Sequence, residues 1–230
     1  MKTAVVVFPG SNCEHDVVYA LEALGGSADL VWHRDTDLSG YDSVVLPGGF
    51  AHGDYLRTGA IARFSPVMAE VNRLASSGAP VLGICNGFQI LCEAGLLPGV
   101  LLQNRDLKFI CKPIHLRVES TNSILTRAAH VGDVLEIPLN SYEGNFTAAP
   151  DELASLESAE QVPLRYSDAS GNVDETSNPN GSTNNIAAVS SGNVAGIMPH
   201  PERAIESILG SADGRILLES FLQSKVSSHV

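Results

Sequence analysis

A short apolar stretch that ends in one cysteine between two glycines constrains this chain more than any other feature. The strand-like segment 81–84 leads into Cys85, and a helical pattern begins at Asn86. A strand that turns this sharply into a helix presents one side chain above a sheet, an arrangement called a nucleophile elbow. Gly83 and Gly87 would relieve the crowding that such a turn creates.

The helix expected from Asn86 would direct its unpaired N–H groups and its positive dipole end at the Cys85 sulfur. Both effects favour the thiolate, which is the form that attacks. The pattern alone fits a tight turn around a structural cysteine equally well. It predicts cysteine chemistry if a base lies elsewhere in the chain.

Composition and charge exclude several classes of protein. The 230 residues are 44% hydrophobic and carry a formal charge of −12. So acidic a chain would repel nucleic-acid phosphates, and no nucleic-acid partner is expected. The N-terminal apolar run is too short for a signal peptide, and no stretch approaches the roughly 20 apolar residues of a membrane span. We expect a cytoplasmic protein with no membrane partner.

Cysteine usage fits a reducing compartment, because the four cysteines form no Cys-x-x-Cys pair. Cys13, Cys92 and Cys111 are expected to be buried or partly buried and unreactive.

Strand and helix signals alternate along the first half of the chain. Strands are expected at 3–8, 28–33, 43–46 and 80–84, and helices at 14–24, 66–75 and 86–94. Ser11 and Glu14 match a capping box with Ser11 as the N-cap. This order predicts an α/β fold with an open, mainly parallel sheet and helices on both faces.

Short strand-like runs dominate the second half and predict antiparallel additions to the sheet. They lie at 109–119, 134–137, 162–166, 186–190 and 194–198, followed by a closing helix at 212–223. The polar segment 167–185 is long for a surface loop, which favours a functional role. Since neither a repeat nor a linker interrupts the chain, we expect a single domain spanning 1–230.

A base for Cys85 is predicted at His200, since it alone among seven histidines stands beside a carboxylate in a constrained setting. Pro199 and Pro201 restrict the backbone to an extended form, which would place His200 and Glu202 on one side. Glu202 could then fix the imidazole tautomer.

An oxyanion hole is also needed. The backbone N–H of Asn86 supplies one donor, and Gly48 and Gly49 at the end of another strand supply the second. The spacing of Cys85, His200 and Glu202 matches no usual zinc pattern, so no metal is expected.

Several motifs together resemble the class I, or triad-type, glutamine amidotransferases. The motifs are Gly83-Ile84-Cys85-Asn86-Gly87-Phe88-Gln89 and Pro199-His200-Pro201-Glu202. The stretches 8–14, 47–60, 178–182 and 198–203 resemble, more narrowly, the glutaminase-subunit family of phosphoribosylformylglycinamidine synthase. The resemblance runs from about Val5 to the final helix and implies a flavodoxin-like fold.

This resemblance implies a role for each matching residue. Cys85 would attack the side-chain amide of glutamine, His200 would move the proton, and Glu202 would orient His200. Water would then hydrolyse the glutamyl thioester. The residues implied in oxyanion stabilisation and substrate binding are Gly48, Gly49, Asn86 and Gln89.

The family also implies partners. Ammonia would pass to a separate synthetase subunit in de novo purine synthesis, with a small bridging subunit in the same complex. ATP and Mg²⁺ would belong to the synthetase, and this chain would need no cofactor. It would be the stand-alone subunit, not part of a fused form, and its segment 167–185 would help dock the synthetase.

One segment departs from the family. Many relatives carry a His-Gly pair before Glu-Gly, whereas this chain has 140–142 as Asn-Ser-Tyr before Glu143. This segment is expected near the α-groups of glutamine. Two other functions stay open: an autonomous γ-glutamyl hydrolase or peptidase of the same fold, and a non-catalytic scaffold, against which the Cys85, His200 and Glu202 set argues.

Overall fold

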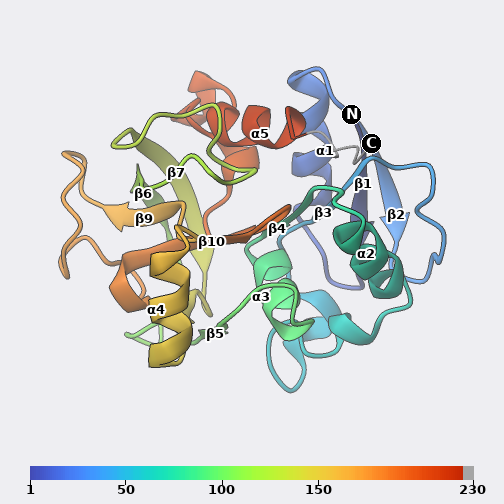
Figure 1. Ribbon diagram of the computed structural model, residues 1–230, viewed down its shortest axis with the longest axis horizontal. Coiled ribbons are helices and arrows are strands. Elements are labelled where there is room, and N and C mark those ends of the chain that lie inside the picture. Colours follow the sequence, from blue (N-terminus) through green and yellow to red (C-terminus); the bar gives the residue numbers. More distant parts are fainter. Residues whose placement is uncertain (225–230) are drawn as a thin grey trace.

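A mixed nine-stranded sheet with helices on both faces forms the centre of the computed structural model, which describes residues 1–224 (Figure 1). The strand order is β2-β1-β3-β4-β11-β10-β9-β6-β7. Neighbours from β2 to β11 run parallel, and the remaining pairs are antiparallel. The predicted α/β fold, with a mainly parallel core and antiparallel additions, is confirmed.

The elements lie close to their predicted positions. The strands of this sheet are β1 (Lys2–Val7), β2 (Ser27–Trp32), β3 (Ser43–Leu46), β4 (Val81–Ile84), β6 (Ile110–Val118), β7 (Val134–Ser141), β9 (Leu164–Ser167), β10 (Ile186–Ser191) and β11 (Val194–Ile197). The helices are α1 (Glu14–Ala23), α2 (Val67–Ser76), α3 (Asn86–Glu93), α4 (Pro150–Ser158) and α5 (Gly214–Leu222). Helix α4 and a small sheet of β5 (Val100–Leu102) and β8 (Asn145–Thr147) were not predicted. No helix within residues 1–224 is long and apolar enough to cross a membrane.

The central parallel strands are covered on both sides. Helices α1 and α5 lie on one face, and α2 and α3 lie on the other (Figure 1). Right-handed crossovers explain this, because β1 to β2 and β3 to β4 move in opposite directions across the sheet. Val44, Leu82 and Ala195 on the central strands are fully buried. Their continuous apolar runs are typical of parallel strands.

The carboxyl ends of β1, β3, β4 and β11 meet at one edge of the sheet. These four strands are adjacent, and the strand order reverses direction beside β1. Open α/β sheets place their ligand sites at this edge. Each predicted site segment follows one of the strands: 48–49 follows β3, Cys85 follows β4, and 200–202 follows β11.

Two local predictions are wrong. Helix α1 begins after Cys13 and has no side-chain cap, because the Ser11 hydroxyl instead accepts the Phe8 N–H at 3.0 Å. The Gly48 carbonyl takes the Cys13 N–H at 3.2 Å, so a contact between loops sets this turn. Cys111 is exposed, not buried, because this part of β6 pairs with β7 alone and extends beyond β9.

We expect Gly87→Ala to lower the free energy of unfolding by about 2–3 kcal/mol, although alanine favours helices. A Cβ on Gly87 would overlap the Leu46 carbonyl on β3. Urea denaturation measures the change. Gly40→Ala is the matched control, since no atom lies within 4 Å of its added Cβ. Equal free energies of unfolding for the two variants would show that the close approach of α3 to β3 does not contribute to stability.

Candidate active site

Cys85 occupies a strained turn between β4 and α3. Its φ of 52° and ψ of −106° lie where non-glycine residues are rarely found. The turn is anchored by the Cys85 N–H, which donates to the Ile197 carbonyl of β11 at 2.8 Å. A Cβ on Gly83 would lie 2.6 Å from the Gly87 carbonyl carbon, so both glycines are required for the turn. The geometry is that of the predicted elbow.

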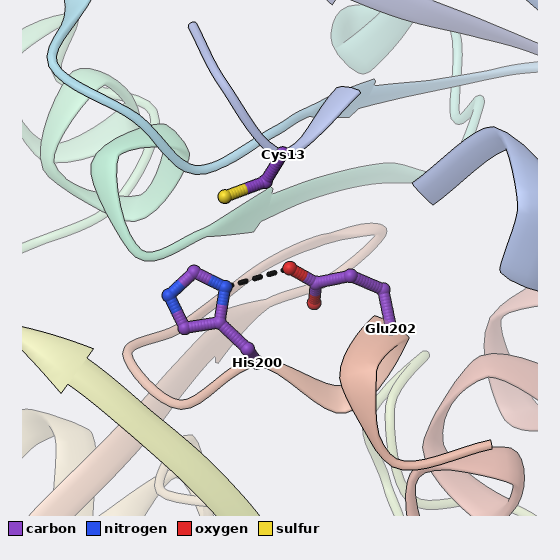
Figure 2. A group of neighbouring side chains, drawn as sticks. All are labelled: Cys13, His200 and Glu202. Carbon is purple, nitrogen blue, oxygen red and sulfur yellow. Dashed lines mark hydrogen bonds and ion pairs between the residues drawn. The ribbon is translucent and has the colours of Figure 1, made fainter. Parts of the chain in front are cut away.

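His200 and Glu202 form a buried pair beside this turn. The His200 Nδ1 lies 2.6 Å from the Glu202 Oε1, and each residue is 2% exposed (Figure 2). The prediction of an extended segment is wrong, because Pro201–Arg203 forms a 3-10 turn. Proline at the first position of a helical turn is favourable, and the turn still brings the two side chains together.

The orientation of His200 leaves its second nitrogen available. A carboxylate on Nδ1 fixes the proton there, so Nε2 is the atom that can exchange protons. Within residues 1–224 this buried Nε2 has no hydrogen-bond partner. Burial lowers the pKa of His200, but the negative charges of Glu202 and Cys85 outweigh burial and hold the pKa well above its usual range.

A cavity of about 390 Å³ opens at this edge of the sheet, a size that fits a small ligand. Cys85, His200, Gly49 and Gln89 all line it. Gly48 lies behind them, where an added Cβ would approach the His200 Cε1 to 2.7 Å. Its lack of a side chain therefore lets the imidazole pack against this loop.

Two backbone donors at the cavity have no acceptor among residues 1–224. They are the N–H groups of Gly49 and Asn86. The Asn86 side chain ties their two loops together, since its Oδ1 accepts the Ala51 N–H at 3.1 Å and its Nδ2 donates to the Gln89 Oε1 at 2.9 Å. Gln89 in turn donates to the Glu143 carbonyl at 2.5 Å. Such preorganised donors are suited to stabilising an oxyanion.

Sequence reasoning missed an acidic pair in the cavity. Asp54 and Glu143 both line it. Burial, followed by the nearby charge of Glu143, raises the pKa of Asp54 to about 6. Its Oδ1 is buried without a partner within residues 1–224, whereas Glu143 accepts the Thr58 hydroxyl. Asp54 has a left-handed φ of 54° that no local sequence pattern marks.

Cys13 was predicted to be buried, and it is 2% exposed, but its contact with the site was missed. Ligand atoms of Cys13, His200 and Glu202 lie within 4.8 Å of one another (Figure 2). Thiolate, imidazole and carboxylate are zinc ligands. Arg203 donates to the Cys13 Sγ at 3.1 Å, however, and its charge would oppose a cation, so we assign no metal to this group.

The segment 167–185 supports one wall of the cavity. Asn180 is fully buried and donates to the Gly144 carbonyl at 2.7 Å, and the Ser182 hydroxyl reaches the same carbonyl at 3.2 Å. These bonds hold the segment that contains Glu143, and residues 140–143 line the cavity. Docking of a partner by 167–185 stays a prediction.

The fold and the cysteine site define a glutamine amidotransferase, and the family model for the CobB/CobQ-like glutamine amidotransferase domain matches residues 1–216. Phosphoribosylformylglycinamidine synthase subunit PurQ of Salinibacter ruber is 52% identical over 95% of this chain and 94% of its own length. PurQ of Trichormus variabilis is 52% identical over 99% of each chain. The chain belongs to the PurQ family, which confirms the resemblance seen in its motifs.

Solved structures agree with this assignment. A chain in the structure of PurLQS from Thermotoga maritima has a TM-score of 0.85 and 42% identity, covering 96% of this chain and 97% of that one. A second protein of Thermotoga maritima, a glutamine amidotransferase, has a TM-score of 0.56 at 17% identity, covering 96% and 90%. This second likeness shows the shared fold alone.

We expect Glu202→Gln to lower the pKa of His200, because the negative charge of Glu202 is the largest influence that raises it. Titration of histidine-labelled protein by NMR measures the shift. Glu206→Gln, on a half-buried residue that accepts the Tyr19 hydroxyl, is the matched control and should leave the His200 pKa unchanged. If the pKa of His200 stayed as high in Glu202→Gln, the ion pair would not govern the imidazole.

Proposed function

We propose that this chain is the glutaminase subunit of phosphoribosylformylglycinamidine synthase and that it hydrolyses glutamine to glutamate and ammonia at Cys85. One observation carries the proposal: the strained Cys85 and the buried His200, which is paired with Glu202, line the same cavity at the ends of adjacent parallel strands. The ammonia serves de novo purine synthesis in the cytoplasm.

The reaction begins with attack by the Cys85 thiolate on the side-chain amide carbon of glutamine. The amide oxygen gains charge, and the Gly49 and Asn86 N–H groups donate to it. Neither N–H group has an acceptor among residues 1–224, so both can donate to the substrate oxygen. Gly48 permits His200 to pack close to the same loop, which keeps nucleophile, base and oxyanion donors together.

His200 then gives its Nε2 proton to the leaving nitrogen, and ammonia departs as the glutamyl thioester forms. A water molecule attacks this thioester while His200 Nε2 accepts the water proton. Breakage of the C–S bond releases glutamate and restores Cys85. Glu202 holds the imidazole and stabilises its charged form throughout, as the raised pKa of His200 supports.

Asp54 and Glu143 are suited to bind the α-ammonium group of glutamine. Both carboxylates line the cavity, and Asp54 has an oxygen without a partner among the described residues. Burial and then the negative charge of Glu143 raise the pKa of Asp54, and a cation between the two carboxylates would relieve their repulsion. Gln89 holds the Glu143 backbone in place and seats the substrate indirectly.

The partners follow from the relatives. The Thermotoga maritima structure contains PurLQS, so counterparts of PurL and PurS are the partners we infer for this chain. The PurL counterpart would use ATP and Mg²⁺ to convert formylglycinamide ribonucleotide to its amidine. In the proposed reaction glutamine binds in the cavity of this chain, and hydrolysis there needs no cofactor.

Cys85→Ala should reduce the glutamine-dependent rate of the assembled complex by at least ~10³-fold, because it removes the nucleophile. The rate with free ammonia should be unchanged, since that step belongs to the synthetase. Amidine formation with each nitrogen source is the measurement. Cys111→Ala, on an exposed cysteine, is the control. A glutamine-dependent rate that survived Cys85→Ala would contradict the mechanism.

Asp54→Asn should raise the KM for glutamine by about 10-fold or more, because a charged hydrogen bond is lost. In the native enzyme the KM should rise as the pH falls through about 6, where Asp54 becomes protonated. The variant should lose this dependence. Initial rates at several pH values measure both effects, with the exposed Asp151→Asn as the charge-matched control. A native KM independent of pH around 6 would rule out this role.

A further inference from the structure

A second thiol shares the cavity with Cys85, and the mechanism above leaves it without a role. Cys13 and Cys85 both line the cavity, and both are buried. The Cys13 sulfur is fixed from two sides: Arg203 donates to it at 3.1 Å, and its S–H donates to the Asn12 Oδ1 at 3.0 Å. Arg203 and Asn12 therefore hold the Cys13 sulfur in place at the cavity.

The two cysteines border one small space beside Gly48. A Cβ placed on Gly48 would lie 3.1 Å from the Cys13 Sγ and 3.5 Å from the Cys85 Cβ. The His200 Cε1 lies nearer still, at 2.7 Å from the same added Cβ, so the imidazole borders this space together with the two cysteines. A disulfide needs its two Cβ atoms about 3.8 Å apart. The bond therefore requires both side chains to rotate toward each other past the His200 ring and the loop after β1 to shift.

We propose that Cys13 and Cys85 form a reversible disulfide when a peroxide enters the cavity. The Cys85 thiolate attacks the peroxide and the O–O bond breaks. The leaving oxygen takes a proton from His200 Nε2 and departs as water or an alcohol, and Cys85 becomes a sulfenic acid. The Cys13 sulfur then attacks the Cys85 sulfur, the S–O bond breaks, water leaves, and Cys13 loses its proton. A dithiol reductant reverses the bond by exchange and is itself oxidised.

The other thiols are poor competitors for this reaction. Burial raises the pKa of the Cys92 thiol, which keeps it protonated. Cys111 is exposed on β6 and does not itself line the cavity, although its β7 partner Asn140 does. The consequence for activity rests on the proposed role of Cys85: the disulfide removes the nucleophile, stops glutamine hydrolysis, and protects Cys85 from irreversible oxidation.

The test uses the full chain exposed to a small excess of hydrogen peroxide. Unreacted thiols are then blocked under denaturing conditions, and peptide masses are mapped. We expect a Cys13–Cys85 cross-linked peptide, nearly complete loss of glutaminase activity, and recovery with dithiothreitol. Cys13→Ser should give no cross-link. Its glutaminase activity should not recover, because the Cys85 sulfenic acid of this variant proceeds to sulfinic acid. Cys111→Ser is the matched control and should behave as the native chain does.

Oxidation of Cys85 without a cross-link to Cys13 would overturn the disulfide, and so would equal recovery in Cys13→Ser. The native cross-link decides the question even if that variant folds poorly. A cross-link that left glutamine hydrolysis intact would instead overturn the catalytic role of Cys85 and the switch with it. Absence of the cross-link in a protein whose hydrolysis requires Cys85 would overturn the disulfide alone.

Discussion

The backbone of Cys85 is the constraint on which the rest of the site depends. A non-glycine residue at φ 52° and ψ −106° costs on the order of 1–3 kcal/mol and persists only where the surroundings enforce it. The fully buried strand β4 lies between β3 and β11, and the Cys85 N–H is bonded to β11. The sheet therefore enforces the strained backbone of Cys85, and the Cys85 sulfur lies at the N-terminus of α3.

The same close packing unites the remaining parts. Gly87 brings α3 against the end of β3, and the Asn86 side chain bonds the loop that follows β3. This holds the loop with the Gly49 donor against the start of α3, where Asn86 follows Cys85. Strand β11, bonded to the elbow, continues into the His200–Glu202 pair. One turn thus sets nucleophile, donors and base in a fixed relation before substrate arrives, which is what electrostatic preorganisation requires.

Much of this arrangement could be predicted from the sequence because its signals are local. The glycines around Cys85 predict the elbow, and the apolar strands predict the parallel core. His200 is two residues from Glu202, so their pairing could also be predicted. Two of the errors lie in the turns beside the site. Ser11 bonds Phe8 instead of capping α1, and the 200–203 segment folds into a 3-10 turn.

Asp54 and the second thiol had no local signal, whereas the family resemblance placed the segment beside Glu143 near the substrate, and this segment does line the cavity. Asp54 reaches the cavity through a run of left-handed residues that only the folded loop defines, and Glu143 arrives from the far half of the chain. Cys13 meets His200 because β1 and β11 end at the same edge of the sheet. Sequence spacing cannot reveal such neighbours, since their proximity is created by the strand order.

A diazoketone analogue of glutamine tests the central claim most directly, because it alkylates the thiolate that attacks the substrate. The chain would be incubated with the analogue, with and without competing glutamine, and its peptides mapped by mass. The account predicts a single modification on Cys85 that glutamine prevents, with Cys13 unmodified beside it. Modification of Cys13 in place of Cys85, or labelling of Cys85 that glutamine does not slow, would contradict it.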